Sequence, residues 1–294
     1  MVQPLSSAFT VALLLGLGGR AVRALSAGAR DVSKLPRLHL DFDLKVGHTV
    51  DLGGNDAHYI SNVMRVKPGF CFRGFNAREG QGEYLLEITE KTARRGGTIS
   101  TVVKSKLRNF DATMSSSLPV TLYFAPVRKP KLKIMMEKAT ELGLSRLVPV
   151  VSQNVNADID FSKEESYARV IMESVEQCER LDVPTLRREP MPLLALLEQL
   201  HDSRLLVCRE RSSEARPLLS ELLSDKDLYF GDKNADWGLL VGPEGGFTAA
   251  ELEYMTSCPQ VTFVSLGQNV LRAETASIAA LACVSSVQEL CRQE

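Results

Sequence analysis

Two glycine-bearing segments carry the residues whose types and spacing could do chemistry. The first is Val241-Gly-Pro-Glu-Gly-Gly-Phe-Thr248, and the second is Leu266-Gly-Gln-Asn-Val-Leu-Arg-Ala-Glu-Thr-Ala276. Glycine lets a backbone approach a ligand closely and adopt positive φ. Each segment follows an apolar run typical of a buried strand and precedes a helical pattern, and α/β folds bind ligands where such strands end. We therefore expect the two segments to form two walls of one pocket.

Several classes of enzyme lack their signatures in this sequence. Neither segment contains the G-K-[ST] ending of a P-loop, which disfavours a nucleotide triphosphatase. The four histidines form no H-E-x-x-H pattern, and no G-x-S-x-G nucleophile elbow is present. The six cysteines include no C-x-x-C pair. We therefore predict neither a metal site nor a disulfide framework.

From Pro119 onwards the sequence alternates between expected strands and helices. The helical stretches carry apolar residues at spacings of three and four, and Thr248-Ala-Ala-Glu251 has the spacing of a capping box. The expected strands are 120–124, 147–151, 205–207, 238–241 and 261–266, and the expected helices are 132–142, 167–178, 273–290 and a short one that starts at Thr248. This alternation predicts an α/β domain over residues 119–294 with a mostly parallel sheet.

Residues 35–110 have a shorter, β-like texture. The expected strands 49–52, 84–88 and 98–103 are separated by turn-forming residues, and apolar spacing predicts one short helix over 56–66. This pattern is typical of a small β-barrel domain. Residues 111–118, which include three consecutive serines, indicate a linker.

The charge is distributed unevenly along the chain. Hydrophobic residues make up 44% and charged residues 24%, which are ordinary values for a globular protein. The formal net charge of −1 combines +3 over residues 1–34, +4 over 35–110 and −8 over 111–294. A basic small domain indicates an anionic partner. No apolar run reaches the roughly 20 residues of a membrane-spanning helix, so we predict no association with a membrane.

The first 30 residues indicate a targeting sequence. They contain Arg20, Arg23 and Arg30 but no Asp or Glu, and residues 9–19 form an apolar run. Acid-poor segments with Arg and Ser are typical of organellar presequences. We expect residues 1–34 to direct the protein to an organelle, with the chloroplast favoured over the mitochondrion. A secretory signal, or a short buried helix in a cytoplasmic protein, remains the alternative.

The two glycine-bearing segments together resemble a known family. They are similar to the GPEGG-(F/L)-(S/T)-x-x-E and LG-x-x-V-L-R-x-E-T-A motifs of the RsmE-type rRNA methyltransferases of the SPOUT superfamily. The resemblance covers nearly the whole chain after residue 34. Further similar stretches are Leu35–Arg37, Leu44–Gly47, His58–Gly69, Glu137–Gly143, Glu176–Arg180 and Val183-Pro184.

The resemblance implies a fold and a reaction. The fold is a PUA-like RNA-binding β-barrel followed by a SPOUT domain with a trefoil knot at its carboxyl end, in a homodimer. The cofactor is S-adenosyl-L-methionine. The reaction is methylation of N3 of a specific uridine in small-subunit (16S-type) ribosomal RNA, free or in the assembled small subunit, as part of ribosome maturation.

The resemblance also assigns a cofactor site. The implied cofactor-binding residues are Val241, Gly242, Pro243, Gly245, Gly246, Leu266, Gly267, Val270, Leu271 and Thr275. Basic side chains bind RNA phosphates. The candidates for this contact are Arg65, Lys67, Arg128, Lys131 and Arg180.

The catalytic candidates follow from the chemistry of uridine. Its N3 carries a proton at neutral pH, so methylation needs a base or a cation that stabilises the deprotonated ring. Arg272 offers guanidinium donors to the uracil carbonyl oxygens. Glu274 is a candidate base, if burial raises its pKa, and Glu244 is a third option. The sequence leaves the choice of base open.

The chain departs from the family pattern at several positions. Asn62 and Asp182 stand where the family commonly has arginine, Glu179 replaces a glycine, and Ser152-Gln-Asn-Val155 replaces an S/T-E-R-S-like stretch. These changes fall on surfaces expected to contact RNA. They leave open a SPOUT methyltransferase that acts on another RNA, such as tRNA, or an inactive RNA-binding assembly factor. The intact glycine-bearing segments favour an enzyme.

Overall fold

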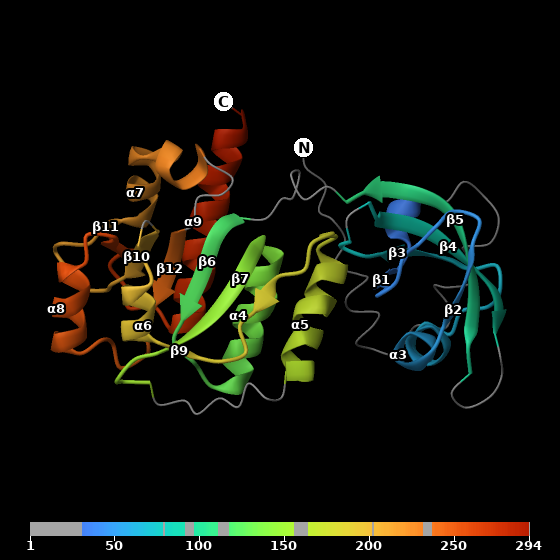
Figure 1. Ribbon diagram of the computed structural model, residues 1–294, viewed down its shortest axis with the longest axis horizontal. Helices are drawn as coiled ribbons and strands as arrows, with labels where there is room; N and C mark the ends of the chain where they lie inside the picture. The colour runs from blue at the N-terminus through green and yellow to red at the C-terminus, as the bar shows by residue number, and fades with distance from the viewer. Residues whose placement is uncertain are drawn as a thin grey trace. The chain divides into compact units, whose positions relative to one another are not determined.

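A computed structural model describes residues 31–78, 80–91, 97–110, 118–155, 164–201, 203–231 and 237–293 (Figure 1). The chain divides into an N-terminal unit, residues 1–112, and a C-terminal unit, residues 113–294. Residues 1–30 of the expected presequence and residues 111–117 of the expected linker lie outside the described ranges. Within those ranges, no helix has both the length and the apolar character needed to cross a membrane.

The N-terminal unit contains a five-stranded sheet of order β1-β3-β4-β5-β2. β1 pairs with β3 in parallel, and the other neighbours are antiparallel. The strands are β1 (Arg37–His39), β2 (Thr49–Leu52), β3 (Cys71–Phe75), β4 (Gly82–Lys91) and β5 (Ile99–Asn109). The expected strands 49–52 and 84–88 lie within β2 and β4, and the expected strand 98–103 starts one residue before β5. The PUA-like assignment stays a prediction.

A short helical segment closes one side of this unit's core. α3 (Gly54–His58) starts two residues before the expected helix and continues as a π-helical turn, η3 (Tyr59–Val63). Ala57 and Ile60 pack into a core that also contains Leu52, Phe72 and Leu86. Of the apolar residues at helical spacing, Ile60 is buried but Val63 is 52% exposed, so the predicted buried face is only partly right, and the helix ends sooner than expected.

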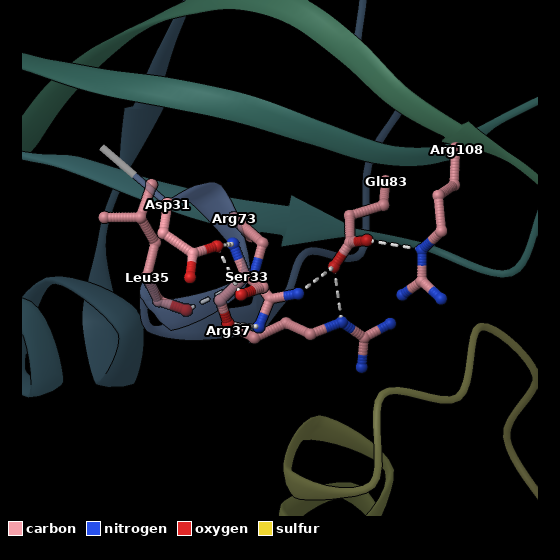
Figure 2. Close-up of polar contacts among 7 residues, drawn as sticks. All are labelled: Asp31, Ser33, Leu35, Arg37, Arg73, Glu83 and Arg108. Atoms are coloured by element: carbon pink, nitrogen blue, oxygen red, sulfur yellow. Dashed lines mark hydrogen bonds and ion pairs between the residues drawn. The ribbon is translucent and has the colours of Figure 1, made fainter. Parts of the chain in front are cut away.

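A buried ionic network links four strands of the N-terminal unit (Figure 2). Glu83 of β4 is 2% exposed and accepts a hydrogen bond of 2.6 Å from Arg37 Nε of β1 and another of 2.6 Å from Arg108 Nε of β5. Arg73 Nη1 of β3 lies 3.7 Å from the same carboxylate. One carboxylate thus serves three guanidinium groups, two of them buried, so this network is sensitive to loss of Glu83.

Residues 31–34, which were predicted to end the presequence, are part of the folded N-terminal unit. Residues Val32–Lys34 form a short 3₁₀ turn, η2, capped by the side chain of Asp31. Arg73 donates hydrogen bonds to the carbonyl oxygens of Ser33 and Leu35, at 3.1 and 3.2 Å. Figure 2 shows this turn beside the ionic network. Residues 31–34 therefore belong to the domain. The sequence did not reveal this, because a three-residue turn held by a distant arginine leaves no periodic pattern.

The C-terminal unit is an α/β domain with a parallel sheet, as predicted. The strand order is β11-β13-β10-β12-β6-β7-β8, with β9 also pairing with β7. All of these pairs are parallel. The strands are β6 (Leu118–Phe124), β7 (Leu144–Val151), β8 (Thr185–Leu186), β9 (Met191–Pro192), β10 (Arg204–Cys208), β11 (Arg216–Pro217), β12 (Trp237–Val241) and β13 (Val261–Ser265). The trefoil knot stays a prediction.

Helices cover both faces of this sheet. α6 and α8 pack into one core with alternate strand residues such as Val148, Val207 and Leu240. The intervening residues point to the other face. There the contacts run from α5 to α4, from α4 to α9 and from α9 to α7. The helices are α4 (Lys129–Glu141), α5 (Glu164–Gln177), α6 (Leu193–Glu198), α7 (Leu218–Ser224), α8 (Ala249–Ser257) and α9 (Ala273–Gln293), with a π-helical turn η5 (Asp227–Gly231).

Candidate functional site

The loops that follow three neighbouring strands enclose one cavity. β13, β10 and β12 lie side by side and end at the same edge of the parallel sheet. The cavity has a volume of roughly 320 Å³. Its lining residues are Cys208, Arg209, Glu210, Arg211, Val241, Gly242, Pro243, Glu244, Gly246, Phe247, Leu252, Leu266, Gly267, Asn269, Val270, Leu271, Ala273 and Ala276. Both glycine-bearing segments therefore reach the same cavity.

The first wall is the glycine-rich loop, residues 242–248, after β12. A turn closes when Gly246 N–H donates to the carbonyl of Pro243 at 2.9 Å. A Cβ at Gly242 would lie 2.7 Å from the ring of Phe247, closer than any side chain tolerates. The loop ends at a capping box in which Thr248 and Glu251 bond each other's backbone N–H, as the sequence predicted. The glycine at 242 is thus required by the close approach of Phe247.

The second wall is the loop 266–272 together with the start of α9. Leu266, Gly267, Val270 and Leu271 line the cavity, and so do the small residues Ala273 and Ala276 of the first helical turn. Gly267 has φ +125°, a conformation in which a side chain is strained. This wall is therefore formed largely by backbone and small or aliphatic side chains.

A third wall was not anticipated from the sequence. Residues 208–211 follow β10 and add Arg209, Glu210 and Arg211 to the lining. This segment has no glycine motif, although the strand at 205–207 was expected and its end must lie at the ligand-binding edge of a parallel sheet. Burial raises the pKa of the Cys208 thiol to about 12. Cys208 is therefore a neutral thiol at neutral pH and a poor nucleophile.

Glu244 in the glycine-rich loop lies among three cationic side chains. Lys131 Nζ of α4 donates a hydrogen bond to Glu244 Oε1. This hydrogen bond and the charge of Lys131, with smaller contributions from the charges of Arg272 and Arg128, lower the pKa of Glu244 below its ordinary value. A carboxylate with a lowered pKa is a poor general base. The structure thus argues against Glu244 as the base and places Arg272, Arg128 and Lys131 within electrostatic reach of one carboxylate.

Arg272 and Glu274 differ in their surroundings. Arg272 is exposed, and its side chain forms no hydrogen bond or ion pair with the residues that the structure describes. Glu274 is half-buried in the first turn of α9, and its Oε2 atom is buried without a hydrogen-bond partner among the same residues. Glu274 does not line the cavity. The two residues make no salt bridge with one another in the described structure, so Arg272 remains available to a substrate.

Two of the predicted cofactor-binding residues do not line the cavity. Thr275 is exposed on α9, and Gly245 contacts the segment that follows β7 instead. The other predicted cofactor-binding residues all line it. Of the ten predicted cofactor-binding residues, eight therefore line the cavity, and Gly245 and Thr275 do not.

The five basic residues predicted to contact RNA lie in different environments. Arg65 and Lys67 are exposed in the N-terminal unit, and Arg128 is exposed just before α4. Arg180 is not available for this role. It is 6% exposed, and its Nη1 donates to the carbonyl oxygens of Thr140 and Leu144, both at 2.8 Å.

The neighbour of Arg180 explains one departure from the family pattern. Arg180 pairs with Asp182, which stands where the family commonly has arginine. The pair is largely buried, and Arg180 fastens the end of α4 to the start of β7. Asp182 thus supplies a counter-charge to a structural arginine. A lone arginine in a sequence does not reveal its burial, which is why the prediction of RNA contact failed here.

Comparisons with known proteins agree with this arrangement. A family model described as an RNA methyltransferase domain matches residues 114–285. The "Ribosomal RNA small subunit methyltransferase E" of Rickettsia conorii is 29% identical over 268 residues, which cover 88% of this chain and 99% of that protein. The protein of the same name from Bacillus subtilis is 27% identical, over 83% of this chain and 92% of that protein.

Solved structures show the same fold. A ribosomal RNA small subunit methyltransferase E from Neisseria gonorrhoeae, bound to S-adenosyl methionine, superposes with a TM-score of 0.69 at 22% identity, over 86% of this chain and 98% of that one. The putative methyltransferase Lpg2936 from Legionella pneumophila, in complex with its cofactor SAM, superposes with a TM-score of 0.70 at 21% identity. The chain therefore belongs to the RNA methyltransferase family that the matching model describes, and the resemblance to RsmE-type proteins predicted from its sequence is confirmed.

Proposed function

We propose that this protein transfers a methyl group from S-adenosyl-L-methionine to N3 of a uridine in small-subunit ribosomal RNA. The observation that carries the proposal is the convergence of both glycine-bearing loops and the start of α9 on one cavity. Arg272 does not line this cavity, but its charge acts on Glu244, which does. The names of the relatives, whose lengths this chain nearly spans, support the choice of RNA.

The residues of the cavity fit the proposed cofactor. Gly242, Gly246 and Gly267 leave room for backbone atoms to approach a ligand. Leu252 and Val270 offer apolar surface to a flat ring, and the carboxylate of Glu210 offsets the positive charge of a sulfonium. When bound, S-adenosyl-L-methionine supplies an electrophilic methyl group. The walls would hold it in line with the acceptor, because such a displacement depends on geometry.

Arg272 is the residue proposed to act on the acceptor base. A uracil that loses its N3 proton spreads negative charge over its two carbonyl oxygens, and a guanidinium can donate hydrogen bonds to them. Glu274 is the remaining candidate for the base, because its Oε2 atom is buried without a partner among the described residues. Glu244 is not proposed as the base, because it accepts a hydrogen bond from Lys131 and thereby helps to hold the glycine-rich loop.

The proposal extends to the partners and the site of action. Arg65, Lys67 and Arg128 are exposed and suited to bind RNA phosphates. The protein would act as a homodimer, with a PUA-like N-terminal unit and a knotted SPOUT domain, on ribosomal RNA or the assembled small subunit. Residues 1–30 would direct it to the chloroplast. Light scattering of the purified protein tests whether it is a dimer. In vitro import into isolated chloroplasts and mitochondria tests the destination.

The direct experiment offers different RNAs to the protein. Protein beginning at Asp31 is incubated with labelled S-adenosyl-L-methionine and small subunits, their free rRNA or tRNA, all from a strain that lacks the modification. Label in small-subunit RNA supports the proposal. Label in tRNA alone would transfer the assignment to a different RNA methyltransferase, and cofactor binding without label in any RNA would favour a binding factor.

A further inference from the structure

The segment after β7 is one of the places in the C-terminal unit where the chain departs from its family pattern, and it contacts the glycine-rich loop of the proposed cofactor site. This segment, Ser152–Val155, is called the β7 loop below. It does not line the cavity. Its contacts are made to the outer side of the glycine-rich loop, which does line it.

Asn154 makes the central contact. Its Nδ2 donates hydrogen bonds to the carbonyl oxygens of Gly245 and Gly246, at 3.2 and 3.0 Å. A Cβ at Gly245 would lie 3.1 Å from the Cβ of Asn154, so the backbone and the side chain are packed tightly together. Gly245, which does not line the cavity, thus lies against Asn154.

A second contact supports the far end of the loop. The backbone N–H of Gln153 donates to Glu251 Oε1 at 2.8 Å, while Oε2 of the same carboxylate accepts from the N–H of Thr248 at 2.8 Å. Glu251 therefore joins the β7 loop to the residue that starts α8. With Lys131 bonded to Glu244, the glycine-rich loop is held at its tip, its middle and its end.

The carbonyls that Asn154 holds belong to the most adaptable part of the loop. Gly245 and Gly246 are adjacent glycines, and Gly246 has φ +68°. Glycines lose more conformational freedom on ordering than other residues. Ordering an unsupported loop when a ligand binds would therefore cost entropy and weaken binding. A side-chain amide that bonds both carbonyls reduces this cost in advance.

We propose that Asn154 is a positioning residue, which preorganises the glycine-rich loop for S-adenosyl-L-methionine. This inference rests on the proposed function in taking the cavity as the cofactor site. It predicts that Asn154 acts on cofactor affinity and leaves the chemical step nearly unchanged.

Two substitutions separate hydrogen bonding from charge. Asn154→Asp keeps the shape of the side chain but removes its donors, and Asn154→Ala removes the donors without adding charge. The dissociation constant of S-adenosyl-L-methionine, measured by calorimetry, should rise about tenfold in both variants, because two hydrogen bonds are lost. The turnover number at saturating cofactor should stay within about twofold of wild type, since Asn154 does not act in the transition state. Asn55→Asp, on an exposed residue of the N-terminal unit, is the matched control and should bind S-adenosyl-L-methionine as wild type does.

The outcomes separate this inference from the proposed function. Wild-type affinity in both Asn154 variants would overturn the inference, and so would a fall in turnover number with unchanged affinity. Weaker cofactor binding by Asn154→Asp together with wild-type binding by Asn154→Ala would also overturn the inference, since the added charge alone would then explain the loss of affinity. A wild-type protein that binds no S-adenosyl-L-methionine would instead refute the proposed function. Circular dichroism melting confirms that each variant is folded before binding is measured.

Discussion

The ammonium group of Lys131 donates a hydrogen bond to the carboxylate of Glu244, which lies 113 residues later in the sequence. The pair joins the first helix of the C-terminal unit to the loop after β12. From the sequence, Lys131 was expected to contact RNA and Glu244 was a possible base. The contact gives both residues a different task, which is to hold the glycine-rich loop.

Lys131→Met should weaken cofactor binding modestly. The pair is partly exposed, and such pairs contribute about 0.2–1 kcal/mol, so the dissociation constant of S-adenosyl-L-methionine should rise by a factor of about 1.4 to 5 at low salt. High salt screens exposed charges, so the difference from wild type should disappear in 1 M NaCl, where the screening length is about 3 Å. Lys129→Met, an exposed lysine on the same helix, is the control. An effect that salt does not reduce would contradict the role of this ion pair.

Glu83→Gln should destabilise the N-terminal unit strongly. The substitution leaves Arg37 and Arg73 buried without their carboxylate, and breaking a buried pair costs about 3–5 kcal/mol. Urea unfolding followed by circular dichroism measures the loss. Glu87→Gln removes the half-exposed partner of Lys104 and should cost less than about 1 kcal/mol. Equal losses in the two variants would contradict the importance assigned to the buried network.

Position 179 should prefer glycine to alanine. Glu179 has φ +62°, and the family commonly has glycine there. Because a side chain in this region costs about 1–2 kcal/mol, Glu179→Gly should be more stable than Glu179→Ala by about 1 kcal/mol. The order should reverse at Glu173, in the exposed face of α5, where glycine is about 1 kcal/mol worse than alanine. Thermal unfolding of the four variants gives both comparisons, and the same order at both positions would refute the argument from φ.

Protein that begins at Asp31 should be more stable than protein that begins at Leu35. The shorter form lacks the η2 turn and removes Ser33, whose carbonyl accepts a hydrogen bond from Arg73. Loss of a hydrogen bond to a charged group costs about 1.5–3 kcal/mol, which urea unfolding can resolve. In addition, N-terminal sequencing of protein isolated from the organelle should find the first residue at or before Asp31. Equal stability of the two forms would contradict the assignment of residues 31–34 to the folded unit.

The sequence predicted those parts of the site that are encoded locally. Apolar runs followed by glycine predicted the two loops, and parallel strand ends explain why Gly242 and Gly267 line one cavity. The third wall at Arg209 and the support from Asn154 depend on which strands become neighbours, which periodicity does not specify. Arg180 was misassigned because burial is a property of the folded chain, and here its donors bond carbonyls of Thr140 and Leu144.

The identity of the methylated nucleoside tests the central claim most directly. Small-subunit RNA treated with the protein and S-adenosyl-L-methionine is digested to nucleosides and analysed by mass spectrometry against standards of the methyluridine isomers. The account predicts 3-methyluridine as the single new product. It also predicts a loss of about 100- to 1,000-fold in turnover number for Arg272→Ala, with cofactor affinity unchanged. A product methylated on another atom, or an Arg272→Ala variant with wild-type turnover, would contradict the account.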